Sequence, residues 1–264
     1  MDPFGVLASW KAKVLATEAK AVQNDWYNGL FNLDADQVEL LKFIGSVSLI
    51  GLTLFLVLRF VFLRHLSADF SNRVVSIMHN FVALSYSAYL VNWSAPFAEV
   101  GRASSAMELK ALGISLGYFT YDFLVCLFIE DDITAHLHHV ASITGLFLGS
   151  VFKQGGYELI VCMVIAESTG PMMHLHYLLK ELKHEGKLAT YNKIAFSFVF
   201  FVARILIGPV LVYHTVTSPT SPLFVKLSGV ALEVLSVFWF YKIVRIYIYK
   251  LRGGSKKAKG KKDQ

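Results

Sequence analysis

The sequence has little cysteine, little charge and no long polar stretch between its apolar segments. Of its 264 residues only 2 are cysteines, Cys126 and Cys162, and both fall within apolar stretches. This excludes a disulfide framework and provides no cysteine spacing for a metal site, so both thiols are expected to be small buried side chains. Charged residues make up 17% of the chain and hydrophobic residues 55%. A soluble domain of this size is less apolar, so we expect one compact membrane domain.

The N-terminus lacks the basic start and the long apolar run of a cleavable signal peptide. We therefore expect the first membrane span to direct the chain to the membrane. The net charge is +6, and much of it lies near the C-terminus in Lys256, Lys257, Lys259, Lys261 and Lys262. A basic segment after a last span is typical of the cytosolic side and of contact with anionic lipid headgroups, and it does not indicate nucleic-acid binding.

Seven apolar stretches of about 18–25 residues follow one another, which is the length that a bilayer core requires. We expect spans at 43–63, 74–93, 111–129, 135–152, 157–179, 194–214 and 223–249. The sequence thus predicts an all-α membrane protein with three parts. These are an N-terminal segment, 1–41, that could form an interfacial helix, a transmembrane domain, 42–250, and a basic cytosolic tail, 251–264.

Lysine and arginine are more frequent in the connection 180–193 than in 215–222, which carries no charge. This bias predicts a lumenal N-terminus and a cytosolic C-terminus, although lysines near the N-terminus weaken it. Lys261 and Lys262 resemble the dilysine retrieval signal of endoplasmic-reticulum proteins, and the alternative is a tail that is merely basic. The expected location is the endoplasmic reticulum or another endomembrane.

Several ionisable side chains fall inside the predicted spans, where a central charge costs roughly 2.5–3.5 kcal/mol on insertion scales. Asp122 lies near the middle of the third span with Tyr118 one turn before it, and a pairing or functional role is favoured. Arg204 lies deep in the sixth span. It is either the salt-bridge partner of Asp122 or Glu167, or a clamp for an anionic headgroup. His79 is either a site residue or a partly solvated residue at a span end.

Three histidines open the fourth span, His136, His138 and His139. Histidine titrates near neutral pH and suits proton transfer. On a helix His136 and His139 are neighbours while His138 points to another side, so at most two can face one site. The ordinary alternative is that the membrane interface wets all three. Because the three do not converge, no metal is predicted.

The fifth span carries Glu167, Pro171 and His174 on one helical stripe. Pro171 has no N–H to donate to the carbonyl of Glu167, so the helix is expected to kink there. A freed carbonyl beside an acid would make a polar notch within the membrane. The alternative is a kink that serves packing alone.

The order of these motifs resembles that of the TLC domain over roughly residues 70–250. The motifs are, in order, Tyr118-x-x-x-Asp122, the acidic turn, His138-His139, and Glu167-Ser168-Thr169-x-Pro171-x-x-His174. The chain looks most like the small stand-alone TLC proteins, which are relatives of TRAM proteins and Lag-type ceramide synthases. The resemblance implies an endoplasmic-reticulum bundle of about seven helices around a lipid-accessible cavity.

In ceramide synthases the paired histidines and intramembrane acids transfer an acyl chain from acyl-CoA to a sphingoid base. By position, His138, His139 and Asp122 would carry that chemistry here. This chain departs from the synthases after the histidines, where it has Ala166-Glu167-Ser168-Thr169-Gly170-Pro171 in place of a further acidic motif.

Two functional hypotheses follow. In the first, a TLC protein that is no synthase binds, senses or distributes membrane lipids, with a headgroup site formed by Glu167, His174, Arg204, His79 and Tyr118. In the second, the chain is an acyl-CoA-dependent N-acyltransferase acting on a sphingoid base or related amine, with His138 or His139 as base or acyl carrier. The expected partners are membrane lipids, including a sphingoid base or ceramide, and not nucleic acid. No cofactor is expected besides acyl-CoA as co-substrate, and a homodimer is left open.

Overall fold

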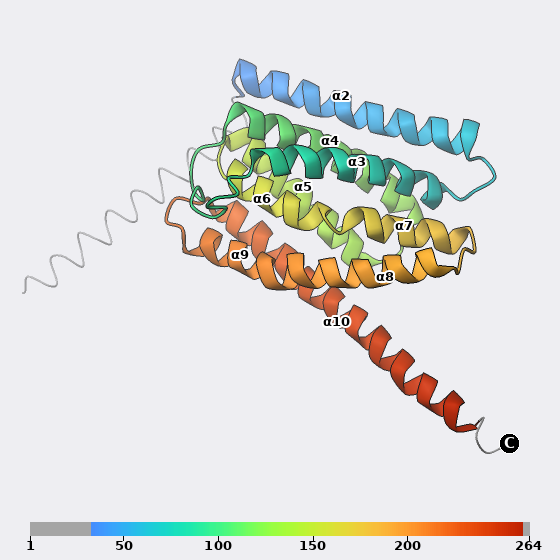
Figure 1. Cartoon of the computed structure of the whole chain (residues 1–264). Coiled ribbons are helices and arrows are strands. Elements are labelled where there is room, and N and C mark those ends of the chain that lie inside the picture. Colours follow the sequence, from blue (N-terminus) through green and yellow to red (C-terminus); the bar gives the residue numbers. More distant parts are fainter. Residues whose placement is uncertain (1–32, 261–264) are drawn as a thin grey trace, which may run out of the picture.

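The computed structural model describes residues 33–260, with side chains as far as Arg252. Within that range the chain consists of helices and their connections, and its one β-bridge joins Ala103 to Gln154. The helices line up end to end as seven rods that run alternately up and down a single bundle (Figure 1). The predicted all-α fold is confirmed for these residues. The predicted interfacial helix, 1–41, lies mostly outside the described residues, and the dilysine pair lies entirely outside them.

The first four rods are α2 (Ala35–Val57) with the π-helical η1 (Leu58–Phe62), α3 (Ala68–Leu90), α4 (Ala106–Ile129) and α5 (Ile133–Phe152). The fifth is α6 (Gly156–Glu167) followed by α7 (Gly170–Glu181). The sixth joins α8 (Lys187–Phe200), the π-helical η2 (Phe201–Ile207) and α9 (Gly208–Thr217), and the seventh is α10 (Leu223–Gly260).

The first four rods begin earlier than the predicted spans because their capping residues lie in the polar connections. Asp34 caps α2 by accepting from the Gln37 N–H at 2.7 Å, and Ser67 caps α3 by accepting from Phe70 at 2.9 Å. Ser105 and Asp132 cap α4 and α5 in the same way. A cap satisfies backbone N–H groups that have no partner within the helix, so it sets the helix start. Hydropathy marks only the apolar run that follows.

Five rods are long and apolar enough to cross a membrane, which makes this a multi-pass membrane protein. They cover Ala35–Phe62, Ala106–Ile129, Gly156–Glu181, Lys187–Thr217 and Leu223–Arg252. The other two, α3 and α5, carry the polar residues of the bundle interior, which lower their hydropathy. The count of seven spans therefore stays a prediction.

The centre of the bundle is α4, which packs tightly against the outer helix α2 (Figure 1). Gly117 makes this approach possible, because a Cβ atom there would lie 2.6 Å from Cβ of Val47. Small residues bring membrane helices close where water provides no driving force between them. The opposite face of α2 is apolar and exposed, with Leu49 64% and Ile50 59% accessible, as expected of a helix that faces lipid.

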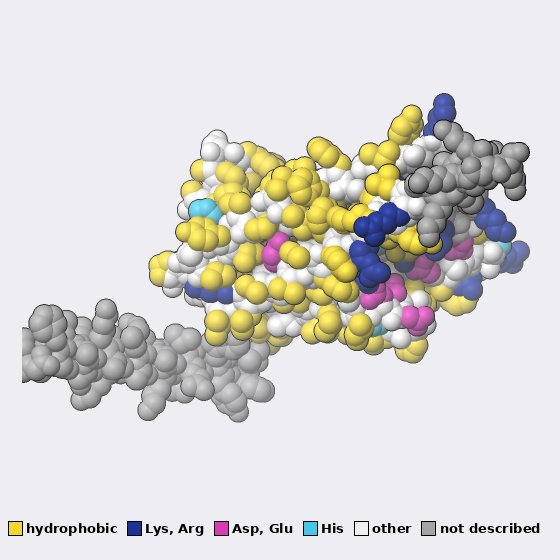
Figure 2. Space-filling view, turned by 90° about the horizontal axis from the view of Figure 1, so that it is seen from below, with side chains coloured by type: hydrophobic (Ala, Val, Ile, Leu, Met, Phe, Trp, Pro, Cys, Tyr) yellow, Lys and Arg dark blue, Asp and Glu magenta, His cyan; other side chains and the backbone are white. Residues whose placement is uncertain are grey.

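The connections at the end where α2 begins are tied together by polar contacts. Glu158 accepts from Gly101 N at 2.9 Å and from the Ser221 hydroxyl at 2.6 Å. Arg102 binds Glu108 and also Glu99, at 2.7 Å. The hydrogen bond from Arg102 holds the pKa of the Glu99 carboxyl below its ordinary value. At the other end of the bundle Lys and Arg side chains gather near the far part of α10, while hydrophobic side chains cover most of the remaining surface (Figure 2).

Candidate functional site

Two groups of polar residues lie inside the bundle. The first, which we call the α3–α4–α5 network, consists of Asn72, Tyr121, Asp122, Cys126 and His139. His139 Nε2 lies 2.8 Å from Asp122 Oδ2, and Asn72 donates to Asp122 Oδ1 at 2.6 Å. Tyr121 in turn donates its hydroxyl proton to Asn72 at 2.9 Å. Both carboxylate oxygens of Asp122 are thus occupied within the bundle.

The second ring nitrogen of His139 is occupied as well. Nδ1 lies 2.8 Å from the carbonyl oxygen of Ala135, which can only accept, so Nδ1 carries the proton. The contact between Nε2 and Asp122 then requires one further proton, shared by the imidazole and the carboxyl group. His139 and Asp122 therefore form what we call a closed pair, in which both ring nitrogens and both carboxylate oxygens are engaged.

Three donor atoms of this network come close enough to hold a metal ion. One ligand atom each of Asp122, Cys126 and His139 lies within 4.8 Å of the other two. Among the described residues, these three form the one group of potential metal ligands that lie this close together. In the structure the hydrogen bonds above already engage the Asp122 and His139 atoms. The absence of a metal stays a prediction.

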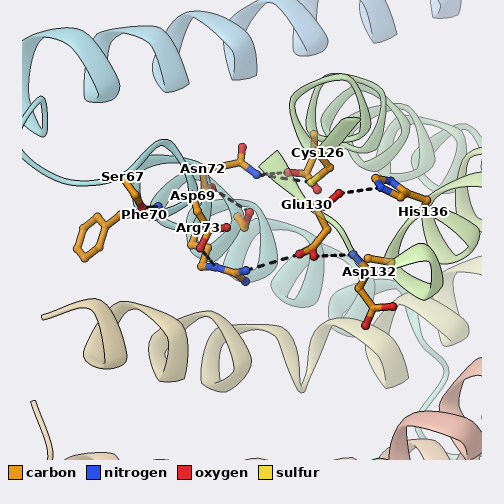
Figure 3. Close-up of polar contacts among 12 residues, drawn as sticks. Ser67, Asp69, Phe70, Asn72, Arg73, Cys126, Glu130, Asp132 and His136 are labelled. Carbon is orange, nitrogen blue, oxygen red and sulfur yellow. Dashed lines mark hydrogen bonds and ion pairs between the residues drawn. The ribbon is translucent and has the colours of Figure 1, made fainter. Parts of the chain in front are cut away.

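The acidic turn between α4 and α5 organises the adjacent end of the bundle (Figure 3). Arg73 binds Asp69 at 2.6 Å and lies 3.9 Å from Glu130. His136 Nε2 contacts the carbonyl oxygen of Glu130 at 3.0 Å, so it does not share a site with His139. Hydrogen bonds from Thr134 lower the pKa of the Asp132 carboxyl, which caps α5.

The second group of polar residues lines a cavity between α5, α6, η2, α9 and α10, part of which opens to the outside of the bundle. Four ionisable side chains reach it near the middle of the bundle: His138, Glu167, Arg204 and Glu233. Beyond them the lining is mostly apolar, from Leu232 and Leu211 as far as Val225. The cavity therefore has a polar part and an apolar part.

Arg204 is bound by neutral groups. Its Nη2 donates to the carbonyl of Ala166 at 2.9 Å, its Nε to the Thr169 hydroxyl at 3.3 Å, and its Nη1 lies 3.5 Å from the Ser236 hydroxyl. No carboxylate of the described residues lies within 4.0 Å of its guanidinium. Of the two alternatives for Arg204, the direct salt bridge with Asp122 or Glu167 is therefore not formed, because Asp122 pairs with His139 and Glu167 with Asn80. Glu167 acts on Arg204 only at longer range.

The break in the fifth rod explains how a carbonyl becomes available to Arg204. α6 ends at Glu167 and α7 begins at Gly170, with Pro171 in its first turn. The predicted kink is confirmed as an interruption of the helix. The break allows α3 to approach closely, since a Cβ atom on Gly170 would lie 2.5 Å from the amide of Asn80. That amide donates to the carboxylate of Glu167.

His138 has a different environment from its neighbour. Its ring lies against Trp239, with ring centroids 5.5 Å apart, and lines the cavity. Its Nδ1 is buried and makes no hydrogen bond. The two adjacent histidines therefore have different surroundings. His139 is part of the α3–α4–α5 network, and His138 faces the cavity.

A family model of the TLC domain matches residues 69–245. The chain belongs to the TLC-domain family. It is 28% identical over 215 residues to TLC domain-containing protein 4-B of Danio rerio, covering 74% of this chain and 78% of the relative. It is 22% identical over 193 residues to TLC domain-containing protein 4 A of Dictyostelium discoideum, covering 67% and 73%. The resemblance to small stand-alone TLC proteins is confirmed.

Within this TLC domain the predicted headgroup residues fall into two places. Glu167 and Arg204 line the cavity, whereas His79, Tyr118 and His174 do not. His79 stacks on Tyr118 with ring centroids 3.8 Å apart, on the side of α4 that faces α3. These rings thus belong to the packing around the α3–α4–α5 network.

Three residues that hydrogen-bond to the predicted site residues were not among the predicted site residues themselves. Asn72 holds Asp122, Asn80 holds Glu167, and Ser236 contacts Arg204. The first two could have been found, because Asn72, Ser76 and Asn80 follow each other at intervals of four on one face of α3. A serine in an apolar helix gives no such signal.

We predict that His139→Ala destabilises the protein more than His138→Ala. His139→Ala leaves Asp122 with a buried unpaired oxygen, which costs about 1–3 kcal/mol. His138→Ala removes a ring whose buried nitrogen has no partner. Thermal unfolding of the purified variants in the same detergent measures the difference, and an equal loss of stability would contradict the assignment of the closed pair.

Proposed function

We propose that this TLC-domain protein binds a membrane lipid in the cavity, with the polar end of the lipid at Arg204 and its hydrocarbon chain in the apolar part. The observation that carries the proposal is a guanidinium near the middle of the span Lys187–Thr217 with no carboxylate within 4.0 Å. It lies beside the apolar part of the cavity.

Arg204 carries its positive charge near the middle of an apolar span. A cation at this depth is costly, and most such residues pair with an acid or line a functional path. Here only neutral oxygens receive its hydrogen bonds. The guanidinium fork matches phosphate and carboxylate groups bidentately. Glu167 and Glu233 act on Arg204 only at longer range, so an anionic lipid group would supply the direct ionic contact that neither acid makes.

The apolar part of the cavity supports a hydrocarbon chain as the second half of the ligand. On α10 the lining extends from Ser236 to Val225, which is about 16 Å at 1.5 Å per residue. Ligand cavities are typically apolar with a few placed polar groups, and this one follows that pattern.

We predict that Gly229→Phe lowers the amount of lipid that copurifies with the protein. A side chain at Gly229 points into open space in the cavity, so a phenyl ring would occupy the volume of the chain. Gly45→Phe is the matched control, because a side chain there also meets nothing within 4 Å but lies on α2, away from the cavity. Quantitative lipid mass spectrometry of both variants gives the answer. Equal lipid in Gly229→Phe, Gly45→Phe and the wild type would contradict the proposal.

The environment of His138 favours a second candidate function. Its unpartnered Nδ1 in the cavity wall could take a proton from an attacking amine, or could carry an acyl group from acyl-CoA to a sphingoid base. The closed Asp122–His139 pair would then position His138. Incubation of the purified protein with acyl-CoA and a sphingoid base tests this function. Turnover that His138→Ala abolishes without loss of folding would favour the acyltransferase, and no turnover in the wild type would reject it.

We also propose an endoplasmic-reticulum location, a lumenal N-terminus, a cytosolic C-terminus and seven spans. The charge bias of the sequence supports this topology, as do the alternating rods, which put the first and last described helix ends at opposite ends of the bundle (Figure 1). The division at 1–41, 42–250 and 251–264 belongs to the same proposal. In sealed microsomes a tag at residue 1 should resist protease and a tag at residue 264 should be cleaved. The reverse result would overturn the orientation.

A further inference from the structure

We propose that the ligand of the cavity is a long-chain amine that carries a terminal phosphate or similar anion, in the order chain, ammonium, anion. Arg204 would bind the anion and Glu233 the ammonium. This inference rests on the proposed lipid binding and adds the class of headgroup and the order of its charges.

The two charged residues lie on the same seam between the sixth and seventh rods. Arg204 lies opposite Ser236, with 3.5 Å between Nη1 and the hydroxyl oxygen. One turn further along, a Cβ atom on Gly208 would lie 2.6 Å from Glu233 Oε2. The two charges are therefore displaced by about one helical turn, or about 5.4 Å along the axis.

Neither charge forms a direct ion pair in the protein, although Arg204 acts electrostatically on both Glu233 and Glu167. Glu233 Oε1 is buried and makes no hydrogen bond, and no cationic group of the described residues lies within 4.0 Å of this carboxylate. Arg204 likewise has no carboxylate partner. Two opposite charges that line one cavity without a direct ion pair between them can each bind an oppositely charged group of one ligand.

The ends of the cavity set the order of those charges. On the side of Arg204 away from Glu233 the wall is formed by His138, which contacts Trp239. On the side of Glu233 the wall continues through Leu232 and Leu211 to Val225, and its far end carries Glu158 and Lys226. A chain in the apolar part therefore reaches Glu233 before Arg204, so the ammonium lies between the chain and the anion.

With this order of charges, common lipid headgroups should bind more weakly because their charges do not match Arg204 and Glu233. In phosphatidylethanolamine and its lyso form the phosphate lies between the chain and the ammonium, which would place like charges together at both residues. A neutral lipid leaves both residues unmatched. An anionic lipid without an amine leaves the Glu233 carboxylate near a second negative charge.

Four single-chain lipids of matched length separate these possibilities. They are sphingosine 1-phosphate, lysophosphatidylethanolamine, sphingosine and lysophosphatidic acid, each titrated into the full-length protein in one detergent and followed by native mass spectrometry. We expect sphingosine 1-phosphate to bind at least about tenfold more tightly than each of the others, as expected for one additional charged hydrogen bond. Equal binding of sphingosine 1-phosphate and lysophosphatidylethanolamine by the wild type would overturn the inference.

Two variants should shift the preference in opposite directions. Glu233→Gln should lower the affinity for sphingosine 1-phosphate to that for lysophosphatidic acid, and Arg204→Gln should lower it to that for sphingosine. Lys226→Gln is the matched control, since it removes a cation from the far end of the same cavity, where the Lys226 ammonium donates to Ser218 O at 2.7 Å. The same loss for every lipid in both variants would show a merely structural role and overturn the inference.

The same titrations separate an error in the order of charges from an error in the proposed lipid binding. If the wild type retains and binds lipid with no preference among the four, lipid binding stands and only the charge order is wrong. If it binds none of the four and copurifies with no lipid, both proposals fail.

Discussion

The charge of Arg204, which no carboxylate contacts directly, is the constraint on which the arrangement of the cavity depends. Near the middle of an apolar span a guanidinium needs hydrogen-bond acceptors, and the fold provides them by interrupting the fifth rod between Glu167 and Gly170. At the interruption the carbonyl of Ala166 accepts from the Thr169 hydroxyl at 2.9 Å, and Arg204 contacts both groups. These neutral groups satisfy its N–H donors without neutralising its charge, which leaves the site suited to an anion.

The contrast with the α3–α4–α5 network supports this view. That network joins a carboxylate, an imidazole and an amide so completely that Asp122 has no free oxygen and His139 no free nitrogen. Satisfied polar networks in a low-dielectric interior specify one packing arrangement. The network and the cavity lie on opposite sides of the His138–His139 pair, so one short motif connects a structural element to a binding surface.

The sequence predicted the helical class, the order of the rods and the break at Pro171, because long apolar runs and a missing N–H are local properties. It did not predict the partners of the buried charges. Which acid pairs with which base depends on how helices rotate and approach each other, and this is set by contacts such as Gly117 with α2 and Gly170 with Asn80. The positions of His138 and His139 on the helix were recognised, but without the neighbouring helices the sequence could not assign one to the cavity and the other to Asp122.

The most direct test of the central claim is photocrosslinking with a single-chain lipid that carries a diazirine at the end of its chain. If the chain occupies the cavity, peptide mapping should find the label on lining residues of different rods, such as Leu159, Leu211 and Val225. An excess of unlabelled lipid should abolish this labelling. Label confined to exposed residues on the outer face of α2, such as Leu49 and Ile50, would contradict binding of the chain in the cavity.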